Sequence, residues 1–343
     1  MSPPLTDNVS PVMYPASSAA KNTTAAATSS SRPSLRTGTA RSSASRDIQW
    51  PGAGKHAPGK FTAVSSGSSG PRPLADVSAA DWLLARVGEF GSGVGGLLPS
   101  GYESYARILH PARPTGHEAG NDREVGPLRW EHVAATTGGL VHPRVQFDAL
   151  VGAPRGEARE FDPDVGELTP PLLSALCEGL AEHTATPEHC WFCLWDGYGW
   201  IAGAPSTAAL ISSEADRGRT VDVPPAFPAE IMNGPRVSLP GRDYILCEGP
   251  LRAANELGWR RGQLLATAFP EFDFDPDDFQ PQSPNLWWPE DRSWCVATEV
   301  DLDSTYVGGS QEMVNALVAD ERFEAWPAQL GDRVDAGADE INR

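Results

Sequence analysis

Residues 190–195 read Cys-Trp-Phe-Cys-Leu-Trp, a continuous run of apolar and aromatic side chains. A short run of this kind, rich in residues that favour β-structure, predicts a buried strand. A loop that contains Pro187 precedes it, and Asp196 follows directly. We therefore expect a buried strand over residues 190–195 and place the remaining elements around it.

A helix is expected before this strand, because Thr169 can cap it, Pro170 suits the first turn, and Leu173, Leu176, Cys177 and Leu180 form an apolar stripe. After the strand, Val237–Leu239 and Tyr244–Cys247 flank Pro240-Gly241, a pair suited to a type II turn, which predicts a hairpin. Further expected elements are helices at 78–90, Tyr102–Leu109, Leu251–Leu257 and after Ser310, strands at Val145–Phe147 and Trp294–Val300, and a long loop at Phe269–Pro289. Strands and helices are mixed without a regular βαβ alternation, so the predicted class is α+β, with a mixed or mainly antiparallel sheet and packed helices.

The N-terminal residues 1–75 differ in composition from the rest of the chain. They are rich in Ser, Thr, Ala, Pro and Gly without apolar periodicity, which predicts a disordered tail. Two alternatives stay open for this segment, an organelle transit peptide and a start codon assigned too far upstream. Residues 76–343 are expected to form an acidic globular α+β domain, or two packed halves that meet near residues 160–170.

The charge of the chain is strongly asymmetric. Its formal net charge is −18, while residues 1–75 carry +6, so residues 76–343 carry −24. This argues against a nucleic-acid groove, which needs clustered Lys and Arg, and against an anionic membrane surface. A basic protein or a small molecule fits better as a partner, although solubility alone also explains such a charge. The oligomeric state is not readable from the sequence.

Lysine is absent after Lys60. Without lysine the globular part cannot form a Schiff base with pyridoxal phosphate, and it cannot supply the phosphate-binding lysine of a Walker-type NTPase or a protein kinase. We expect no cofactor.

Five cysteines and the absence of a signal-peptide pattern or of a run of about 20 apolar residues indicate a cytoplasmic protein with free thiols. Cys190 and Cys193, preceded by His189, resemble a redox or zinc motif. On a strand, however, positions 190 and 193 point to opposite faces, and no second Cys/His pair with zinc spacing exists. We therefore expect two structural cysteines and no metal.

Two other motifs have the wrong context. Gly91, Gly93 and Gly96 match the dinucleotide fingerprint, but a helix is expected before them instead of a strand. The acidic run at residues 271–278 lacks the Gly and Glu that an EF-hand requires, so we expect an acidic loop, with a weak divalent-cation site as the alternative. Asp196, Glu248 and Asp301 lie at or just past strand ends, where catalytic carboxylates often lie, and so do ordinary ones.

Tryptophan is the most unusual feature of the sequence. Trp195 and the Trp287-Trp288 pair each lie beside charged residues, and aromatic faces next to carboxylates hold sugar rings and organic cations. Since exposed indoles rarely cluster without a partner, we predict that the fold brings the 286–289 loop against the end of strand 190–195. The predicted ligand-binding residues are Trp195, Asp196, Trp287, Trp288 and Arg292; no catalytic residue is assigned.

Several stretches together resemble a group of uncharacterised actinobacterial proteins. They are residues 101–111 (Gly-Tyr-Glu-Ser-Tyr-Ala-Arg-Ile-Leu-His-Pro), residues 190–192 leading to 195–199, Asn285–Pro289, residues 294–301 and residues 305–310. The resemblance covers about residues 78–343 and excludes the tail. It implies a domain start near residue 78 and a bacterial cytosol, and it implies no activity.

Two functional classes remain open from the sequence. We favour a non-catalytic cytoplasmic binding or interaction protein with an acidic surface and a Trp-lined region. The alternative is a hydrolase of unfamiliar type with carboxylates near Trp195 and Trp288. A convergence of Asp196, Glu290, Asp291 and Asp301 on one pocket would favour the hydrolase.

Overall fold

The expected strand at residues 190–195 is strand β5 (Cys190–Trp195) in the computed structural model. The structure describes residues 70–115, 126–155, 157–202, 204–207, 220–223, 225–260, 275 and 278–342. All of them belong to one compact unit, Phe61–Arg343. The expected acidic loop at 271–278 lies almost entirely outside these described residues.

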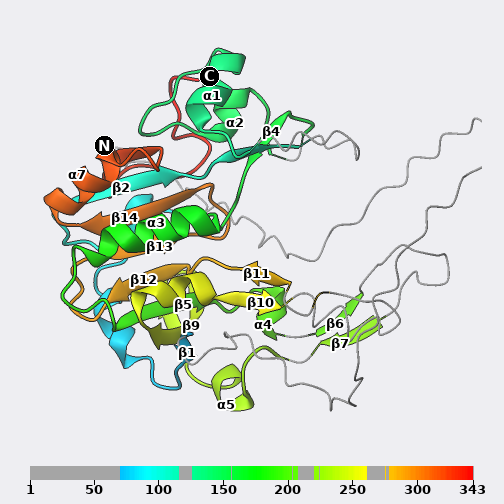
Figure 1. Cartoon of the computed structure of the whole chain (residues 1–343), viewed down its shortest axis with the longest axis vertical. Coiled ribbons are helices and arrows are strands. Elements are labelled where there is room, and N and C mark those ends of the chain that lie inside the picture. The colour runs from blue at the N-terminus through cyan, green and yellow to red at the C-terminus, as the bar shows by residue number, and fades with distance from the viewer. Residues whose placement is uncertain are drawn as a thin grey trace, which may run out of the picture. The chain divides into compact units, whose positions relative to one another are not determined.

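Within the described residues, nine strands form one sheet, in which every pairing is antiparallel (Figure 1). The strand order is β1-β9-β5-β12-β13-β14-β2-β15, and β8 pairs with β9. The other strands of this sheet are β1 (Arg72–Pro73), β2 (Ser104–Leu109), β8 (Val237–Leu239), β9 (Arg242–Gly249), β12 (Leu286–Pro289), β13 (Cys295–Thr298), β14 (Ser304–Gly309) and β15 (Ala325–Ala328). The α+β class with an antiparallel sheet is therefore confirmed.

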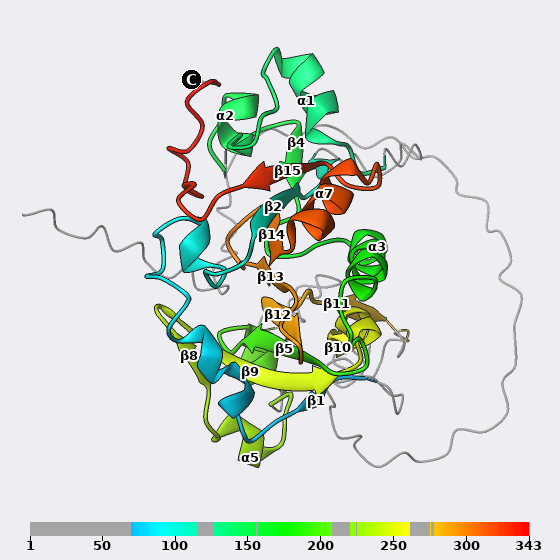
Figure 2. The same cartoon turned by 90° about the vertical axis from the view of Figure 1, so that its left-hand side faces the viewer.

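The two faces of the sheet have different covers (Figure 2). Apolar residues of α3 (Pro170–Ala181), α7 (Gln311–Ala319) and the 3-10 helix η4 (Leu251–Glu256) pack on one face. The other face is covered by residues 80–98, which include the 3-10 helices η1 (Ser78–Leu83) and η2 (Val94–Gly96). Because β5 lies between these layers, Cys190 faces the first cover and Cys193 the second, as predicted.

A smaller apolar cluster lies beyond β2. It joins α1 (Trp130–Thr137) and α2 (Phe147–Val151), and the Trp130 and Phe147 rings meet edge to face with centroids 4.9 Å apart. The remaining short elements are β3 (Ala112–Pro114) with β4 (Phe161–Pro163), β6 (Ala204–Thr207) with β7 (Thr220–Val223), β10 (Gly258–Arg260) with β11 (Phe279–Pro281), and helices α4 (Gly199–Ala202) and α5 (Ala229–Met232).

Several local predictions are confirmed. The helix after Thr169 is α3, and the 237–247 hairpin is formed by β8 and β9, with Gly241 at φ 79° as a type II turn requires. The helix after Ser310 is α7, and the Ser310 hydroxyl accepts a hydrogen bond from the Met313 amide at 3.2 Å.

Other local predictions are wrong. Residues 104–109 form strand β2 instead of a helix, because β14 and β15 hydrogen-bond to both of its edges and both of its faces are buried. The segment at 145–147 leads into α2, and the long loop expected up to Pro289 ends in strands β11 and β12. The expected helices at 78–90 and 251–257 are short 3-10 helices.

The boundary of the tail at residue 75 also needs correction. Strand β1 lies before it, with Arg72 opposite Glu248 and Pro73 opposite Cys247 on β9. The Leu74 amide donates a further hydrogen bond to the Leu246 carbonyl at 2.8 Å. Among the described residues, sheet pairing therefore begins at Arg72. An apolar-periodicity argument misses this because a two-residue strand carries no period.

Candidate functional site

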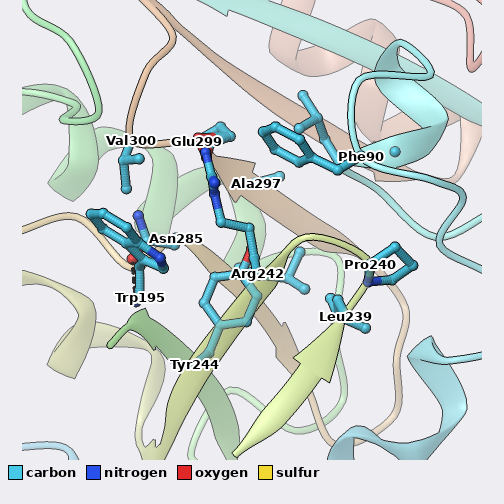
Figure 3. A pocket seen from close by; sticks show the side chains of 13 residues that line it. Phe90, Trp195, Leu239, Pro240, Arg242, Tyr244, Asn285, Ala297, Glu299 and Val300 are labelled. Carbon is cyan, nitrogen blue, oxygen red and sulfur yellow. Dashed lines mark hydrogen bonds and ion pairs between the residues drawn. The ribbon is translucent and has the colours of Figure 1, made fainter. Parts of the chain in front are cut away.

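A pocket lies at the edge of the sheet where β5 and β13 end and where β9 and β12 begin. These four ends meet because neighbouring antiparallel strands run in opposite directions. The pocket has about 410 Å³ of empty space, counting the open solvent at its mouth. Figure 3 shows its main side chains. It is lined by Phe90, Gly96, Leu97, Trp195, Leu239, Pro240, Arg242, Tyr244, Asn285, Leu286, Ala297, Glu299 and Val300.

Asn285 fixes the Trp195 wall of the pocket. The Trp195 amide donates to Asn285 Oδ1 at 2.8 Å, and the Asn285 amide nitrogen donates to the Tyr198 hydroxyl at 2.8 Å and to the Thr298 carbonyl at 3.1 Å. The Trp195 and Tyr198 rings meet edge to face with centroids 5.4 Å apart. A Cβ at Gly197 would lie 2.2 Å from the Trp195 indole, so only glycine leaves room for the ring in this position.

Arg242 forms the polar centre of the pocket. Its Nε donates to Glu299 Oε1 at 2.7 Å, and its Nη2 donates to Asp301 Oδ2 at 3.0 Å. Its Cζ lies 4.2 Å from the centroid of the Phe90 ring and 5.5 Å from that of the Trp195 ring, so the guanidinium also makes cation–π contacts. Burial raises the pKa of Glu299, and the Arg242 guanidinium offsets part of this effect.

The rim of the pocket carries more carboxylates than guanidinium groups. Asp196 accepts a hydrogen bond from Arg236 Nε at 2.9 Å, and its amide donates to the carbonyl of the exposed Asp243. At the pocket itself, two carboxylates, those of Glu299 and Asp301, pair with one guanidinium group, that of Arg242. The rim is therefore net acidic around aromatic walls.

Trp287 and Trp288 directly follow two pocket-lining residues in the sequence, but their own indoles do not line the pocket. β12 pairs with β5 and places Trp287 opposite Phe192 and Trp288 opposite Trp191, so the two expected segments are neighbours. Both indoles are 0% exposed. Because successive strand residues alternate, Trp287 packs with Phe192 and Trp294 on one face and Trp288 with Trp82 on the other. Their neighbours Asn285 and Leu286 line the pocket in their place.

Arg292 and Asp291 follow the other end of β12. Asp291 Oδ2 accepts hydrogen bonds from the Thr184 hydroxyl at 2.8 Å and the Ala185 amide at 2.7 Å. Burial alone would raise the pKa of Asp291, but these bonds and those from Ser293 lower it. This end lies one β5 length, about 20 Å, from Asp196.

The four carboxylates whose convergence would favour a hydrolase do not meet in one pocket. Glu290 lies with Asp291 at the far end, where its amide donates to the His189 carbonyl just before β5. Asp196 and Asp301 lie at the pocket rim, and each pairs with its own arginine.

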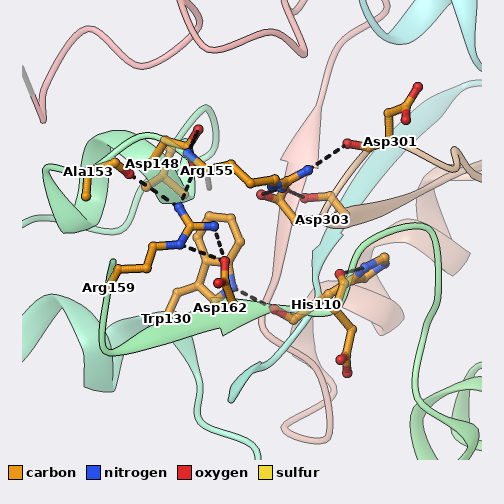
Figure 4. Close-up of polar contacts among 12 residues, drawn as sticks. His110, Trp130, Asp148, Ala153, Arg155, Arg159, Asp162, Asp301 and Asp303 are labelled. Atoms are coloured by element: carbon orange, nitrogen blue, oxygen red, sulfur yellow. Dashed lines mark hydrogen bonds and ion pairs between the residues drawn. The ribbon is translucent and has the colours of Figure 1, made fainter. Parts of the chain in front are cut away.

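A polar network supports the segment behind the pocket (Figure 4). Arg155 donates to the Asp301 carbonyl at 3.2 Å and to Asp303 Oδ2 at 3.5 Å. Arg159 pairs with Asp148 at 2.7 Å and with Asp162. Burial of its guanidinium lowers the pKa of Arg159, but the two carboxylates outweigh this effect and raise it. These contacts fasten the loop after α2 to the residues that follow β13, which is a structural role.

His110 and Glu167 are the titratable groups next to this network. His110 is fully buried, with Nδ1 2.8 Å from the Asp164 carbonyl oxygen and Nε2 2.9 Å from Thr305 Oγ1, and burial lowers its pKa. Burial, with a contribution from Asp164, raises the pKa of Glu167 to about 7. No described residue donates a hydrogen bond to the Glu167 carboxyl.

The two motifs that resembled cofactor sites have structural roles. All five cysteines are free and buried, and burial raises the pKa of Cys190 to about 12. Across the described part of the chain, no group of three or more His, Cys, Asp or Glu could hold a metal ion. In the glycine motif, the Gly95 amide donates to the Leu330 carbonyl at 2.8 Å and the Val94 amide to the Asp332 carbonyl at 3.0 Å, so these amides are not free for a phosphate.

Sequence reasoning missed Phe90, Arg242, Asn285 and Glu299. Signals in the sequence could have pointed to two of them: Arg242 directly follows the Pro240-Gly241 turn, and Glu299 stands at the end of an otherwise apolar strand. No helix among the described residues has the length and hydrophobicity needed to cross a membrane. No protein-family model, curated protein or solved structure matches the chain.

Proposed function

We propose that this protein is a non-catalytic binding protein whose pocket receives a basic segment of a partner protein. The observation that carries this proposal is the combination of aromatic walls with a net acidic rim around Arg242. Aromatic faces next to carboxylates attract organic cations. The net charge of −18 would also speed the approach of a basic partner.

The exposed ring of Phe90 is the most direct contact point for a partner. It is 43% exposed although it packs on Arg242, so its outer face remains accessible. The Asp301 side chain, which pairs with Arg242, is 59% exposed. A partner arginine or lysine could therefore contact an aromatic ring and a carboxylate together.

The states of the ionisable groups favour binding over catalysis. Asp196, Glu299 and Asp301 each pair with an arginine, and the cysteine thiols are buried. None of these groups is arranged as a nucleophile beside a base. A cytoplasmic location, and a place among the actinobacterial proteins that the sequence resembles, belong to the same proposal.

The test uses fluorescent peptides of equal length that are rich in arginine, rich in lysine or neutral, with binding followed by anisotropy. We expect the basic peptides to bind the full chain and the neutral one not to bind. Phe90→Ala and Asp301→Asn should each weaken binding about tenfold. Leu84→Ala is the matched control, because Leu84 is 57% exposed and lies outside the pocket lining.

Equal binding by all these variants would place the basic-peptide surface elsewhere and contradict the proposal. Absence of binding to any basic peptide would contradict it as well. High salt should weaken binding, since the rim charges are exposed.

A hydrolase is the second candidate, and one observation favours it. Glu167 has a pKa raised to about 7, in the range of a general acid or base, and both Glu167 and Glu299 act electrostatically on Tyr198. A panel of chromogenic esters, glycosides and phosphates tests it. The hydrolase is supported if the wild-type chain and the control Glu157→Gln both hydrolyse a substrate and Glu167→Gln does not.

A further inference from the structure

A second cluster of aromatic and cationic side chains lies at the opposite end of β12 from the pocket. Trp82 of η1 packs edge to face on Trp288, with ring centroids 5.9 Å apart. The Cζ atoms of two arginines lie over the same Trp82 ring, Arg86 at 5.7 Å and Arg292 at 5.2 Å from its centroid. Two cations that are distant in sequence thus meet at one indole.

Neither guanidinium has a partner of opposite charge. Within the described residues, the side chains of Arg86 and Arg292 make no ion pair and no hydrogen bond. A carboxylate pairs with five other exposed arginines, Arg72, Arg113, Arg252, Arg322 and Arg333, although not with Arg144. In a chain with 45 Asp and Glu against 27 Lys and Arg, two unpaired arginines over one indole stand out.

The backbone holds both arginines in place. Arg292 has a left-handed conformation, with φ 55°, which residues other than glycine rarely adopt. Its amide donates to the Pro289 carbonyl at 2.9 Å, and its carbonyl accepts a hydrogen bond from the Tyr102 hydroxyl at 3.2 Å. The Arg86 carbonyl accepts from the Ser100 amide at 2.9 Å. The arrangement therefore does not depend on flexible surface backbone.

A further donor at this cluster lacks an acceptor. Trp82 Nε1 is a buried atom without a hydrogen-bond partner in the described structure. Buried polar atoms usually have a partner, and an absent ion is one explanation when they do not. An unpaired donor and two cations without a carboxylate partner thus share one indole.

We infer that Arg86, Trp82 and Arg292 form a binding site for a phosphoryl group. A phosphate monoester carries a charge of about −1.5 to −2 at pH 7, which matches two guanidinium groups, whereas one carboxylate matches a single arginine. This inference is independent of the function proposed for the pocket.

The test measures binding of inorganic phosphate to the full chain by calorimetry and by thermal shift, with chloride at equal ionic strength as the reference. Glycerol phosphate and acetate are tested in parallel, to separate a phosphate ester from the free ion and a phosphoryl group from a carboxylate. We expect both phosphates to raise the melting temperature and acetate to have no effect.

Arg86→Gln and Arg292→Gly should each raise the apparent Kd for phosphate at least tenfold. Glycine at 292 keeps the left-handed backbone without strain, so this variant should fold normally. Arg144→Gln is the matched control, because Arg144 is also exposed and unpaired among the described residues but is not at this cluster, and it should bind as the wild type does.

Three outcomes would overturn the inference: no difference between chloride and either of the two phosphates, equal stabilisation by acetate, or unchanged phosphate binding in both Arg86→Gln and Arg292→Gly. Binding of glycerol phosphate but not inorganic phosphate would support an esterified ligand at the same site.

Discussion

The Cζ atom of Arg242 lies 4.2 Å from the centroid of the Phe90 ring. The same guanidinium pairs with Glu299, whose side chain is only 7% exposed. Arg242 thus connects an exposed aromatic ring to a buried carboxylate, and the shape of the pocket depends on this one side chain.

Arg242→Met should lower the free energy of unfolding by about 3 kcal/mol, because it leaves the charge of Glu299 buried without a partner. Denaturant unfolding measures the change. Adding Glu299→Gln to Arg242→Met should restore part of the loss, since the unpaired charge is then absent.

Asp301→Asn is the control for this pair. Its side chain is 59% exposed, so losing its bond to Arg242 should cost about 0–1 kcal/mol. Equal losses for Arg242→Met and Asp301→Asn would show that burial of Glu299 does not determine the effect.

Glu167 should make stability depend on pH. Its pKa in the folded state is about 7, above its ordinary value of 4.5, so the folded chain binds this proton more tightly than the unfolded chain does. The stabilising contribution is full below pH 4.5 and is lost as the pH rises to 7. Because Glu167 is half-buried, solvent screening makes the loss smaller than the full shift implies.

Glu167→Gln should therefore flatten the fall in the free energy of unfolding between pH 5 and pH 7, measured by denaturant unfolding at several pH values. The exposed Glu157 supplies a control, because Glu157→Gln should keep the wild-type slope. If Glu167→Gln leaves the pH dependence of the free energy of unfolding unchanged, protonation of Glu167 is not the cause of that dependence.

The cysteines should be unreactive in the folded protein. All five are buried, and burial raises the pKa of Cys177, Cys190 and Cys247 to about 12, so the nucleophilic thiolate is scarce at pH 8. A thiol reagent such as Ellman's should label none within minutes and all five after unfolding. Rapid labelling of any native thiol would contradict this.

The N-terminal boundary can be tested by two truncations. From the composition of the segment, removal of residues 1–69 should leave the melting temperature unchanged. Removal of residues 1–75 should lower it by several degrees, because the pairing of β1 with β9 and the Leu74 hydrogen bond are lost. Identical melting curves for both truncations would show that β1 contributes nothing to stability.

Gly166 supports the pocket from behind. It has φ +71°, and a Cβ there would lie 2.6 Å from the carbonyl oxygen of Val300, which lines the pocket. Gly166→Ala should therefore cost at least about 3 kcal/mol, through backbone strain plus this clash. Gly152, at φ +68° with open space around its Cβ position, is the matched comparison and should cost about 1 kcal/mol on mutation to Ala.

The sequence was most informative where local chemistry decides the structure. The apolar run at 190–195, the Pro240-Gly241 turn and the Ser310 cap each predict their element correctly. At residues 104–109 the local pattern failed, because a strand buried on both faces has no alternation and cannot be told from a helix by periodicity.

The candidate site could be predicted only in part. Trp195 lines the pocket, and the expected contact between segment 286–289 and strand 190–195 is present as the pairing of β12 with β5. The sequence could not show that Trp287 and Trp288 are core residues, since a Trp pair looks the same whether or not its faces are covered. Phe90 and Arg242 meet only through the tertiary fold, so no spacing in the chain reveals them.

The position of β2 between two strands that come much later in the chain has a consequence for folding. β2 pairs with β14 on one edge and β15 on the other, and β14 begins at Ser304. During synthesis, the ribosome must add residues 110–303 before β2 can meet its first partner, which takes about 10–40 s. Throughout that interval an apolar strand remains without its neighbours, and such long-range pairing slows folding and increases exposure to aggregation.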